Sequence, residues 1–481
     1  MLSAKIESAG YVEGEAIIGN VSINAERGKL VLVGGRSGSG KTTLLFAITG
    51  ILHTLLGGWV KGKVSYDERE DILALEDPVS ASGKIYGFVL QDPDRQLLMP
   101  TPLDEVMFTL ENFGSEENEA ETRARELLNR FGLGEKMLKH VEDLSGGEKR
   151  RLSLASAIAH DPPVILFDEP TASLDPWGIR ELRTFIAEQL RLGKTVIVVE
   201  HKAKYFLDLA SEVVVLEGKG RAREFRELDE YDAVSRELDS LGVDASHVVS
   251  KRKDRNKKGW KVLEVKNLSC WYGNRDEEPL FEDVELELES GEIVALVGPN
   301  GSGKTTLLKA IAGIHKKCNG EVKISDENRK KPFYVPQVPE YLFIKNTLEE
   351  EILSLSKKTG KRIEKITEML EFYEHRKSSS PYTLSLGQRR WLSAVIAWSY
   401  NPPLMLFDEP TVGLDKLMLS ELFRRIEILK KEGASILIST HDPRVLAEVA
   451  ERAYVLENRR LKECDPDEKG LELEEIAYGR L

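Results

Sequence analysis

Two blocks of this sequence each occur twice, and this internal repeat limits the possible folds more than any other feature. The first block, GGRSGSGKTTLL at 34–45, returns as GPNGSGKTTLL at 298–308. The second, LSGGEKRRLSLASAIAHDPPVILFDEPTASLD at 144–175, returns as LSLGQRRWLSAVIAWSYNPPLMLFDEPTVGLD at 384–415. Long blocks that recur in the same order indicate two copies of one domain.

The composition fits two ordinary globular domains. The chain has 481 residues, of which 41% are hydrophobic, enough to form two buried cores. We predict a first domain at 1–222, a charged linker at 223–259 and a second domain at 260–481. Within the linker, the basic stretch 251–258 (KRKDRNKK) fits either a solvated spacer or a patch attracted to anionic lipid or nucleic acid.

Charge and cysteine content exclude several classes of protein. The formal net charge is −13, so no overall positive field attracts nucleic acid. Cys270, Cys318 and Cys464 lie far apart without metal-ligand spacing, which argues against a disulfide framework and favours a reducing cytosol. The uncharged run 42–60 has nearly the length of a membrane-spanning helix, but its glycines and threonines favour a buried helix. We expect no spanning helix.

The first repeated block contains the phosphate-binding pattern GxxxxGK[ST]. In both copies a β-branched run precedes the pattern and an apolar helical run follows it, as a P-loop requires. The glycines allow a tight loop whose N–H groups point at phosphate, the lysine reaches the β- and γ-phosphates, and the following threonine is a ligand for Mg²⁺. The predicted nucleotide-binding residues are Gly35, Gly38, Gly40, Lys41, Thr42 and Thr43, and Gly298, Gly301, Gly303, Lys304, Thr305 and Thr306.

Two adjacent carboxylates end a short apolar strand in each copy. The strands are PVILFDEP at 163–170 and PLMLFDEP at 403–410. Adjacent acids at the end of a buried strand are costly unless a cation or water lies there, and ligands bind at that edge of a parallel sheet. We therefore predict that the aspartates hold Mg²⁺ and that the glutamates orient and deprotonate the attacking water. These residues are Asp168 and Asp408, and Glu169 and Glu409.

The pentapeptides LSGGE (144–148) and LSLGQ (384–388), called signatures below, complete a resemblance to the ABC ATPase superfamily. The resemblance implies an α/β fold with two tandem P-loop domains, each with a RecA-like core, an antiparallel β subdomain and a helical subdomain that carries the signature. It also implies ATP hydrolysis in two composite sites. Ser385 and Gly387 would complete the site of Lys41, and Ser145 and Gly147 that of Lys304.

The same resemblance assigns roles to residues outside the repeated blocks or near their ends. Gln91 and Gln337 match a loop glutamine, the Q-loop, that senses Mg²⁺ with the nucleotide. His201 and His441 match a catalytic histidine at the γ-phosphate. Asp175 and Asp415 match an aspartate of the D-loop, and Tyr11 and Tyr272 match an aromatic residue that stacks on adenine.

The two copies differ from the usual signature at two positions. Leu386 replaces a glycine and adds bulk beside the phosphate-facing backbone, and Glu148 replaces a glutamine and adds negative charge. Because the two changes fall on opposite composite sites, we expect the sites to have unequal activities.

The stretch 91–114 (QDPDRQLLMPTPLDEVMFTLENFG) is similar to the ATPases of energy-coupling-factor importers and of cobalt and nickel uptake. It also predicts a helix capped by Thr101, and Thr347 begins an equivalent helix in the second copy. The resemblance implies uptake of a vitamin or a transition metal, whose identity the sequence does not reveal. It implies a transmembrane coupling protein and a separate membrane substrate-binding protein as partners, and a peripheral location on the cytoplasmic face of the membrane.

Two apolar runs beside the glutamine loops are candidates for the partner surface. They are Leu97–Met99 and Tyr341–Ile344, and they fit either core residues or a groove for an amphipathic helix. An alternative function stays open, namely a soluble ABC protein in translation or nucleic-acid maintenance. Relatives in translation usually carry a long helical linker, of which the polar linker here is a poor version. The cysteine cluster, zinc modules and coiled coils of other relatives in that class are absent from this sequence.

Overall fold

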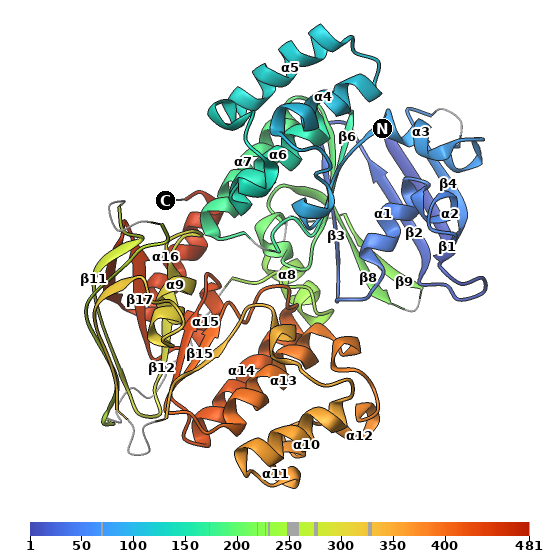
Figure 1. Cartoon of the computed structure of the whole chain (residues 1–481). Coiled ribbons are helices and arrows are strands. Elements are labelled where there is room, and N and C mark those ends of the chain that lie inside the picture. The colour runs from blue at the N-terminus through green and yellow to red at the C-terminus, as the bar shows by residue number, and fades with distance from the viewer. Residues whose placement is uncertain are drawn as a thin grey trace. The chain divides into compact units, whose positions relative to one another are not determined.

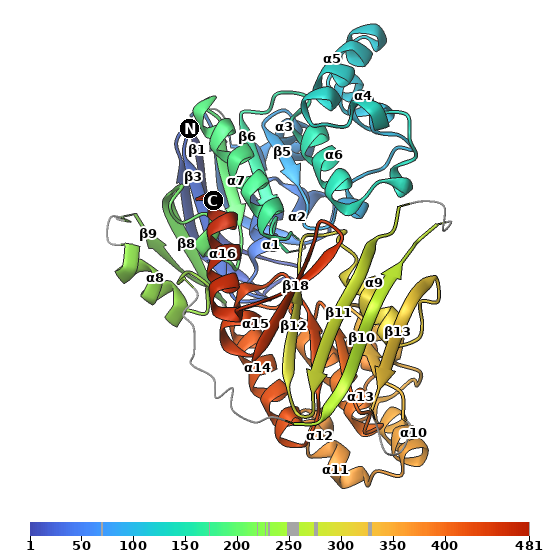
Figure 2. The ribbon, with the colours of Figure 1, turned by 90° about the vertical axis from the view of Figure 1, so that its left-hand side faces the viewer.

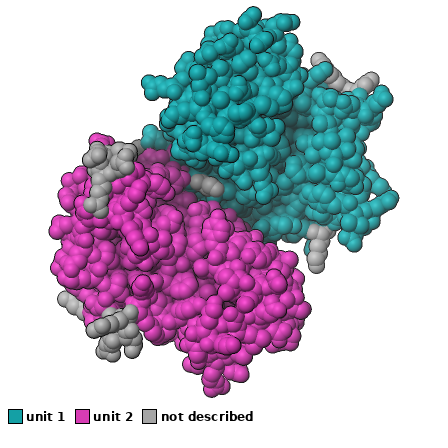
Figure 3. Space-filling model, in the orientation of Figure 1, with its two compact units in different colours: residues 1–174, 178–246 teal, residues 175–177, 247–481 magenta. Residues whose placement is uncertain are grey.

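The chain forms two compact units in a computed structural model that describes residues 1–68, 71–172, 174–218, 220–226, 228, 231–247, 259–273, 278–325 and 330–480. Unit 1 comprises residues 1–174 and 178–246, and unit 2 comprises residues 175–177 and 247–481 (Figure 3). Both units have the same α/β architecture, as the repeat predicts.

A six-stranded sheet in the order β5-β6-β7-β3-β8-β9 forms the centre of unit 1. Its first five strands are parallel, and β9 pairs antiparallel with β8. Every residue of β3, β6 and β7 is buried, because helices cover both faces of such a sheet. The strands are β3 (Leu30–Gly35), β5 (Tyr86–Val89), β6 (Val164–Asp168), β7 (Thr195–Val199), β8 (Ala210–Gly218) and β9 (Arg221–Phe225).

An antiparallel sheet in the order β2-β1-β4 and a set of helices complete unit 1. Figure 1 shows α4 and α5 at one end of this unit and β1, β2 and β4 at another. The strands are β1 (Leu2–Gly10), β2 (Ile18–Ala25) and β4 (Trp59–Tyr66). The helices are α1 (Lys41–Ile48), α2 (Ile51–Thr54), α3 (Pro78–Gly83), α4 (Pro102–Asn112), α5 (Glu117–Arg130), α6 (Gly146–Ile158), α7 (Pro176–Arg191) and α8 (Tyr231–Ser240).

Unit 2 repeats both sheets, in the orders β14-β15-β16-β12-β17-β18 and β11-β10-β13. Figure 2 shows α10, α11 and α12 together at one end of this unit. The strands are β10 (Lys261–Cys270), β11 (Phe281–Glu289), β12 (Ile293–Val297), β13 (Cys318–Ile324), β14 (Phe333–Val335), β15 (Met405–Asp408), β16 (Ile436–Ser439), β17 (Arg452–Glu457) and β18 (Arg460–Cys464). The helices are α9 (Lys304–Ile311), α10 (Leu348–Thr359), α11 (Ile363–Thr367), α12 (Tyr373–Arg376), α13 (Leu386–Ser399), α14 (Lys416–Lys431), α15 (Pro443–Glu448) and α16 (Pro466–Tyr478).

Helices α4 and α10 begin where the sequence predicts. The Thr101 hydroxyl accepts a hydrogen bond from the Asp104 N–H, and the Thr347 hydroxyl accepts one from the Glu350 N–H, both at 3.2 Å. Each bond satisfies an N–H group that has no partner inside its helix. Among the described residues, no helix is both long and apolar enough to span a membrane.

The predicted linker at 223–259 is partly folded. Helix α8 lies within it, and Val234 and Leu238 of this helix are buried. Unit 1 therefore extends to Ser246, because these apolar side chains pack against it. The basic stretch 251–258 lies outside the described residues.

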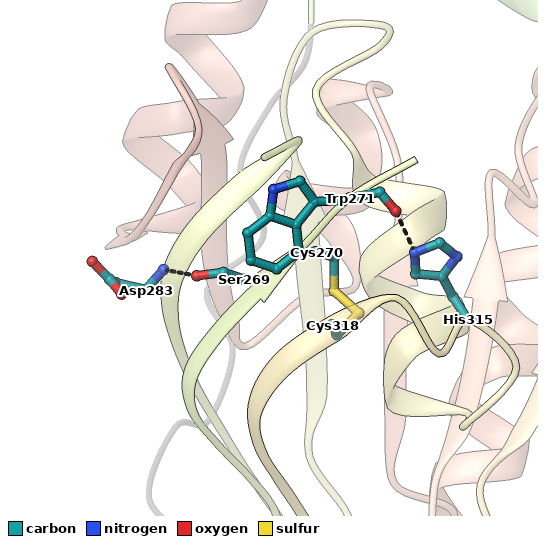
Figure 4. The surroundings of a disulfide bond; sticks show 6 residues. All are labelled: Ser269, Cys270, Trp271, Asp283, His315 and Cys318. Carbon is teal, nitrogen blue, oxygen red and sulfur yellow. Dashed lines mark hydrogen bonds between the residues drawn. A yellow bond between two sulfur atoms is a disulfide. The ribbon is translucent and has the colours of Figure 1, made fainter. Parts of the chain in front are cut away.

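The prediction that the cysteines form no disulfide is wrong, because Cys270 and Cys318 are bonded (Figure 4). They are separated by 48 residues in sequence, but they are register partners on the neighbouring strands β10 and β13, with Cα atoms 4.1 Å apart. Strand pairing, which sequence distance does not reveal, brings them together. Cys464 is free.

Candidate functional site

Each P-loop connects a buried strand to the start of a helix. Between β3 and α1, the Lys41 ammonium donates to the carbonyls of Gly35 and Arg36 at 3.1 and 3.2 Å. Helix α1 has no side-chain cap and no acidic residue in its first turn, so its N–H groups and dipole are available to an anion. Gly38 lies in the loop with φ +76°, and Thr43 is buried in α1.

Unit 2 reproduces this loop between β12 and α9. Lys304 donates to the carbonyls of Gly298 and Pro299 at 2.8 and 3.1 Å. Gly301 has φ +80°, close to its counterpart in unit 1, and Thr306 is buried.

Glycine is required at the residue immediately before each of these helices. Gly40 and Gly303 have φ values of +100° and +102°, in the left-handed region that side chains rarely adopt. A Cβ atom at Gly40 would lie 2.8 Å from Ile17, and one at Gly303 would lie 2.9 Å from Phe281. Both loops therefore depend on glycine for their backbone conformation and for close packing against the antiparallel sheet.

In unit 1 the predicted catalytic side chains meet at the carboxyl end of β6. The Thr42 hydroxyl lies 2.9 and 3.1 Å from the two carboxylate oxygens of Asp168. The Lys41 ammonium lies 3.2 Å from the Glu169 carboxylate, and the His201 imidazole lies 3.8 Å from it. Strands β3, β6 and β7 are parallel neighbours, so their carboxyl ends bring these residues together.

Unit 2 forms the equivalent cluster at the end of β15. The Thr305 hydroxyl donates to Asp408 at 2.9 Å. The Glu409 carboxylate lies 3.1 Å from the His441 ring and 3.7 Å from the Lys304 ammonium. The two sites thus share one arrangement, with a tighter glutamate–histidine contact in unit 2.

The two adjacent carboxyl groups of unit 1 have opposite pKa shifts. Burial raises the pKa of Asp168 to about 6, against the hydrogen bond from Thr42. Burial would also raise the pKa of Glu169, but the hydrogen bond and charge of His201 and the charge of Lys41 lower it to about 2. The pKa of Glu409 is likewise lowered, because the charges of His441 and Lys304 outweigh its burial. Both glutamates are therefore ionised at neutral pH, as a base for water must be.

Both glutamates also have a strained backbone. Glu169 has φ +43° and Glu409 has φ +44°, in a region that costs a residue with a Cβ about 1–2 kcal/mol. Because the same strain occurs at the same position of both copies, we infer that the site requires the glutamate side chain to have this particular orientation at the end of the strand.

The hydroxyl and carboxylate pairs fit a magnesium ion. Mg²⁺ is bound through oxygen, usually by one or two carboxylates together with substrate phosphates. Thr42 with Asp168, and Thr305 with Asp408, supply such oxygens beside a P-loop. Among the residues described, no cluster of three or more His, Cys, Asp and Glu has a metal-binding arrangement.

The two glutamine loops are placed differently. The Gln91 amide donates to the Glu169 carboxylate at 3.3 Å, so in unit 1 this loop reaches the catalytic cluster. Gln337 is exposed, and its backbone carbonyl accepts a hydrogen bond from Arg390.

The predicted adenine-stacking residues are exposed, Tyr272 at 74% and Tyr11 at 43%. Tyr272 is the second residue after β10, which ends at the disulfide-bonded Cys270. The His315 ring forms a hydrogen bond with the Trp271 carbonyl at 2.9 Å (Figure 4). The Lys317 ammonium donates to the Tyr272 carbonyl at 3.3 Å. The backbone that carries Tyr272 is therefore fixed while its ring is open to a ligand.

Both signature serines begin a helix. Ser145 and Glu148 of α6 exchange hydrogen bonds as a capping box, and Ser385 and Gln388 of α13 do the same. Gly147 and Gly387 lie in the first turns of these helices. The predicted pairing of each signature with the P-loop of the other copy stays a prediction.

The charge of Glu148 is paired inside unit 1. Its carboxylate forms a close ion pair with Lys136, and this hydrogen bond lowers its pKa. Glu148 thus caps α6 as a glutamine would, and its charge gives less reason to expect unequal sites. Leu386 is half-buried, and its Cδ2 lies 3.0 Å from where a Cβ of Gly413 would be.

The two D-loop aspartates accept backbone hydrogen bonds. Asp415 accepts from the Met418 N–H and caps α14. Asp175 belongs to the short segment grouped with unit 2, and there it accepts from the Asn300 N–H of the second P-loop at 2.6 Å.

Two buried arginines are functional candidates that sequence reasoning missed. Arg150 of α6 donates to the carbonyls of Leu90 and Pro170, and Arg390 of α13 donates to those of Gln337 and Glu409. Each joins the signature helix to the glutamine loop and to the end of the catalytic strand. The sequence does contain a clue to these two arginines, because each stands at the same position after the signature of its copy.

Comparisons with known proteins agree with this geometry. The model of the ABC transporter family matches residues 18–172 and 281–412. A protein of Methanosarcina mazei and one of Saccharolobus solfataricus, both named as ABC transporter ATP-binding proteins, are 30% and 32% identical to this chain. The matches cover 95% and 93% of this chain and 94% and 90% of those proteins. A Bacillus subtilis protein whose name assigns it to HMP/thiamine import is 28% identical over 96% of this chain and 90% of its own.

Solved structures match the whole fold at lower identity. An RNase-L inhibitor has a TM-score of 0.65 at 20% identity, covering 95% of this chain and 90% of its own. An archaeal ribosome recycling factor, solved with a ribosomal stalk protein, has the same TM-score and identity over 93% and 87%. This likeness concerns the tandem α/β fold.

Proposed function

Because this chain belongs to the ABC transporter family, and is therefore an ATPase, we propose that it is the ATP-hydrolysing subunit of an importer whose membrane-spanning part is a separate protein. We further propose that ATP is bound with Mg²⁺ by both units, and that the transported solute is a vitamin or a transition metal.

The chain's own residues account for hydrolysis in this proposal. Lys41 would bind the phosphates held by its loop, and its ammonium lies 3.2 Å from the Glu169 carboxylate. Glu169, ionised and held in a strained backbone, accepts a proton from water, and His201 lies where it can contact the γ-phosphate. Bound Mg²⁺ supplies charge neutralisation at the phosphates. Unit 2 uses Lys304, Glu409 and His441 in the same way.

The observation that carries the importer proposal is a set of exposed apolar side chains beside each glutamine loop. Leu98 is 70% exposed in unit 1, and Tyr341 and Ile344 are 78% and 60% exposed in unit 2. Leu97 and Leu342 are partly buried and Phe343 is core, so only part of each predicted run is available to a partner. Exposed apolar residues next to a nucleotide-sensing loop suit an amphipathic helix of a membrane partner.

The proposed assembly follows from this surface. A transmembrane coupling protein would contact both apolar sets, a separate membrane protein would bind the solute, and the chain would lie peripherally on the cytoplasmic face of the membrane. The relative named for HMP/thiamine import supports this assignment. In this proposal nucleic acid is no partner, and the two units pair within one chain.

The alternative, a soluble ABC protein acting in translation, has its own specific observation. The solved structures that match nearly the whole chain are an RNase-L inhibitor and an archaeal ribosome recycling factor, and they favour this alternative. At 20% identity the likeness describes the fold, which both functions share. Sedimentation separates the two proposals, since the alternative expects the chain with ribosomes and the importer expects it with membranes.

Hydrolysis is tested by Glu169→Gln combined with Glu409→Gln. Loss of the general base typically lowers the rate about 10²–10⁴-fold, so ATPase activity should fall by this factor while ATP still binds. Normal turnover in this double variant would contradict the proposed role of the glutamates.

The partner surface is tested by charged substitutions in the exposed sets. Leu98→Glu and Ile344→Glu should reduce co-sedimentation with membranes of the source organism and leave ATPase activity of the free chain nearly unchanged. The matched control is Leu192→Glu, which changes an apolar side chain of similar exposure, 62%, outside both sets. Membrane binding that survives both substitutions would count against the importer.

A further inference from the structure

The two magnesium-site aspartates differ in the number of hydroxyl groups that hold them. Asp408 accepts three such hydrogen bonds, from Thr305 at 2.9 Å, from Ser439 at 2.7 Å and from Tyr334 at 2.7 Å. The first two reach one carboxylate oxygen and the third reaches the other. The carboxylate of unit 2 is therefore fixed at both oxygens.

Asp168 lacks two of these three partners. Within the described part of the chain, its side chain accepts hydrogen bonds from Thr42 alone. Phe88 and Val199 occupy the positions equivalent to Tyr334 and Ser439, and neither has a group to donate.

The strand register shows that these positions are equivalent. Ser439 is the register partner of Asp408 on β16, and Val199 is that of Asp168 on β7. Tyr334 pairs with Leu406 and Phe88 with Leu166, each two residues before the aspartate on the neighbouring strand. At the two strand positions where unit 2 has the donors Tyr334 and Ser439, unit 1 therefore has the apolar residues Phe88 and Val199.

A further exchange accompanies this difference. In unit 1, Phe88 packs edge-on against Phe46, with ring centroids 6.1 Å apart. In unit 2 the residue equivalent to Phe46 is Lys309, whose ammonium lies 6.0 Å from the Tyr334 ring. The surroundings of the tyrosine are polar where those of the phenylalanine are apolar, so each pair forms a consistent local environment.

We propose that Tyr334 and Ser439 are positioning residues that preorganise Asp408 for Mg²⁺, so that unit 2 binds nucleotide at a lower Mg²⁺ concentration than unit 1. This inference rests on the proposed function, in which both units bind ATP with Mg²⁺. Groups that orient a metal ligand typically change metal affinity by about 10–100-fold. A carboxylate has about four lone-pair sites, so these three donors do not use up its capacity to accept.

The test isolates each unit within the full chain. Lys41→Ala disables the first P-loop, and in this background a fluorescent, non-hydrolysable ATP analogue is titrated at buffered Mg²⁺ concentrations. Tyr334→Phe should raise the Mg²⁺ concentration for half-saturation about 10-fold, and Ser439→Val should raise it further. In EDTA, where no Mg²⁺ is free, these variants should bind the analogue as tightly as the Lys41→Ala parent. A general structural defect would weaken binding in EDTA too.

The reciprocal exchange and a control sharpen the test. In the Lys304→Ala background, Phe88→Tyr with Val199→Ser should lower the Mg²⁺ requirement of unit 1. Tyr454→Phe removes the hydroxyl of another, buried tyrosine, which accepts a hydrogen bond from Arg452, and should leave the Mg²⁺ requirement of unit 2 unchanged.

Two results would overturn the inference and separate it from the proposed function. If the analogue binds the Lys41→Ala chain with clear Mg²⁺ dependence and Tyr334→Phe leaves that dependence unaltered, only the roles of Tyr334 and Ser439 are wrong. If binding shows no Mg²⁺ dependence in either single-lysine background, the use of Mg²⁺ in the proposed function is wrong as well.

Discussion

Asp168 and Glu169 are adjacent in the sequence, yet the fold separates their chemistry. The aspartate lies deep at the strand end, where its pKa rises to about 6, and the glutamate lies beside His201 and Lys41, where its pKa falls to about 2. Burial acts on both carboxyl groups, and only the glutamate has cations close enough to reverse it. Two neighbouring acids thereby become suited to two roles.

Asp168→Asn should stabilise the nucleotide-free chain at high pH. The pKa of Asp168 in the folded chain, about 6, lies above its ordinary value of 3.8. Between these values the folded state binds a proton that the unfolded state has lost, so the stability that Asp168 confers falls as the pH rises through this window. At pH 8 the substitution should therefore raise the free energy of unfolding by about 1–3 kcal/mol, and at pH 4, near the lower end of the window, only a small part of this gain should remain.

Denaturant unfolding without Mg²⁺ checks this expectation. Glu111→Gln, which neutralises an exposed carboxylate on α4, is the control and should have little effect at either pH. An equal gain at pH 4 and pH 8 would show that the ionised form of Asp168 is not the cause.

The sequence predicted residue identities at the sites better than their environments. The residues that P-loop chemistry requires lie together as expected in each unit, because the motifs specify both residue type and spacing. The pairing of Glu148 with Lys136 was not foreseen, because it depends on how the turn after α5 packs against α6. Arg150 and Arg390 were missed for the same reason, since a buried arginine and a surface arginine look alike in a sequence.

For the helices and strands, the sequence did not reveal which strands pair or in which register. The helix starts at Thr101 and Thr347 follow from local side-chain chemistry, and they were predicted correctly. The disulfide depends on the register of β10 against β13, which no local pattern encodes. Helix α8 was hidden in a charged stretch because its few buried residues are spaced among polar ones.

The disulfide predicts how many thiols can be titrated, and it predicts that a reductant destabilises unit 2 and not unit 1. Of three cysteines two are bonded, so the denatured, unreduced chain should have one titratable thiol, and the reduced chain three. Reduction should lower the free energy of unfolding of unit 2 by roughly 2–4 kcal/mol, because the bond closes a long loop in the unfolded chain. Three thiols without a reductant would refute the bond.

Unit 1 serves as the internal control for this experiment. All three cysteines belong to unit 2, so the unfolding transition of unit 1 should not respond to the reductant. A shift of both transitions together would mean that the reductant acts other than through Cys270 and Cys318.

At the scale of the whole molecule, the division into two compact units predicts two unfolding transitions, each sensitive to its own P-loop. A ligand stabilises the state that binds it by RT ln(1 + [L]/Kd), about 2.7 kcal/mol at a ligand concentration of 100 Kd. Lys41→Ala should therefore remove the shift that a non-hydrolysable ATP analogue causes in unit 1 and preserve that in unit 2. Lys304→Ala should do the reverse.

Calorimetry of the two lysine variants also compares the sites. Unequal shifts at one Mg²⁺ concentration are expected, since Asp408 and Asp168 are held by different numbers of donors. Identical shifts in both variants over a range of Mg²⁺ would contradict the expectation of unequal sites.

The exchange of Phe88 for Tyr334 has an evolutionary consequence. In a homodimer of identical shorter chains, any substitution would appear in both sites at once, because symmetry repeats every residue. A polypeptide that contains both copies is free of this constraint, so one copy can carry the hydroxyl of Tyr334 while the other carries Phe88 without one. Selection can then adjust the two ATP sites separately, while translation of a single reading frame keeps them in equal number.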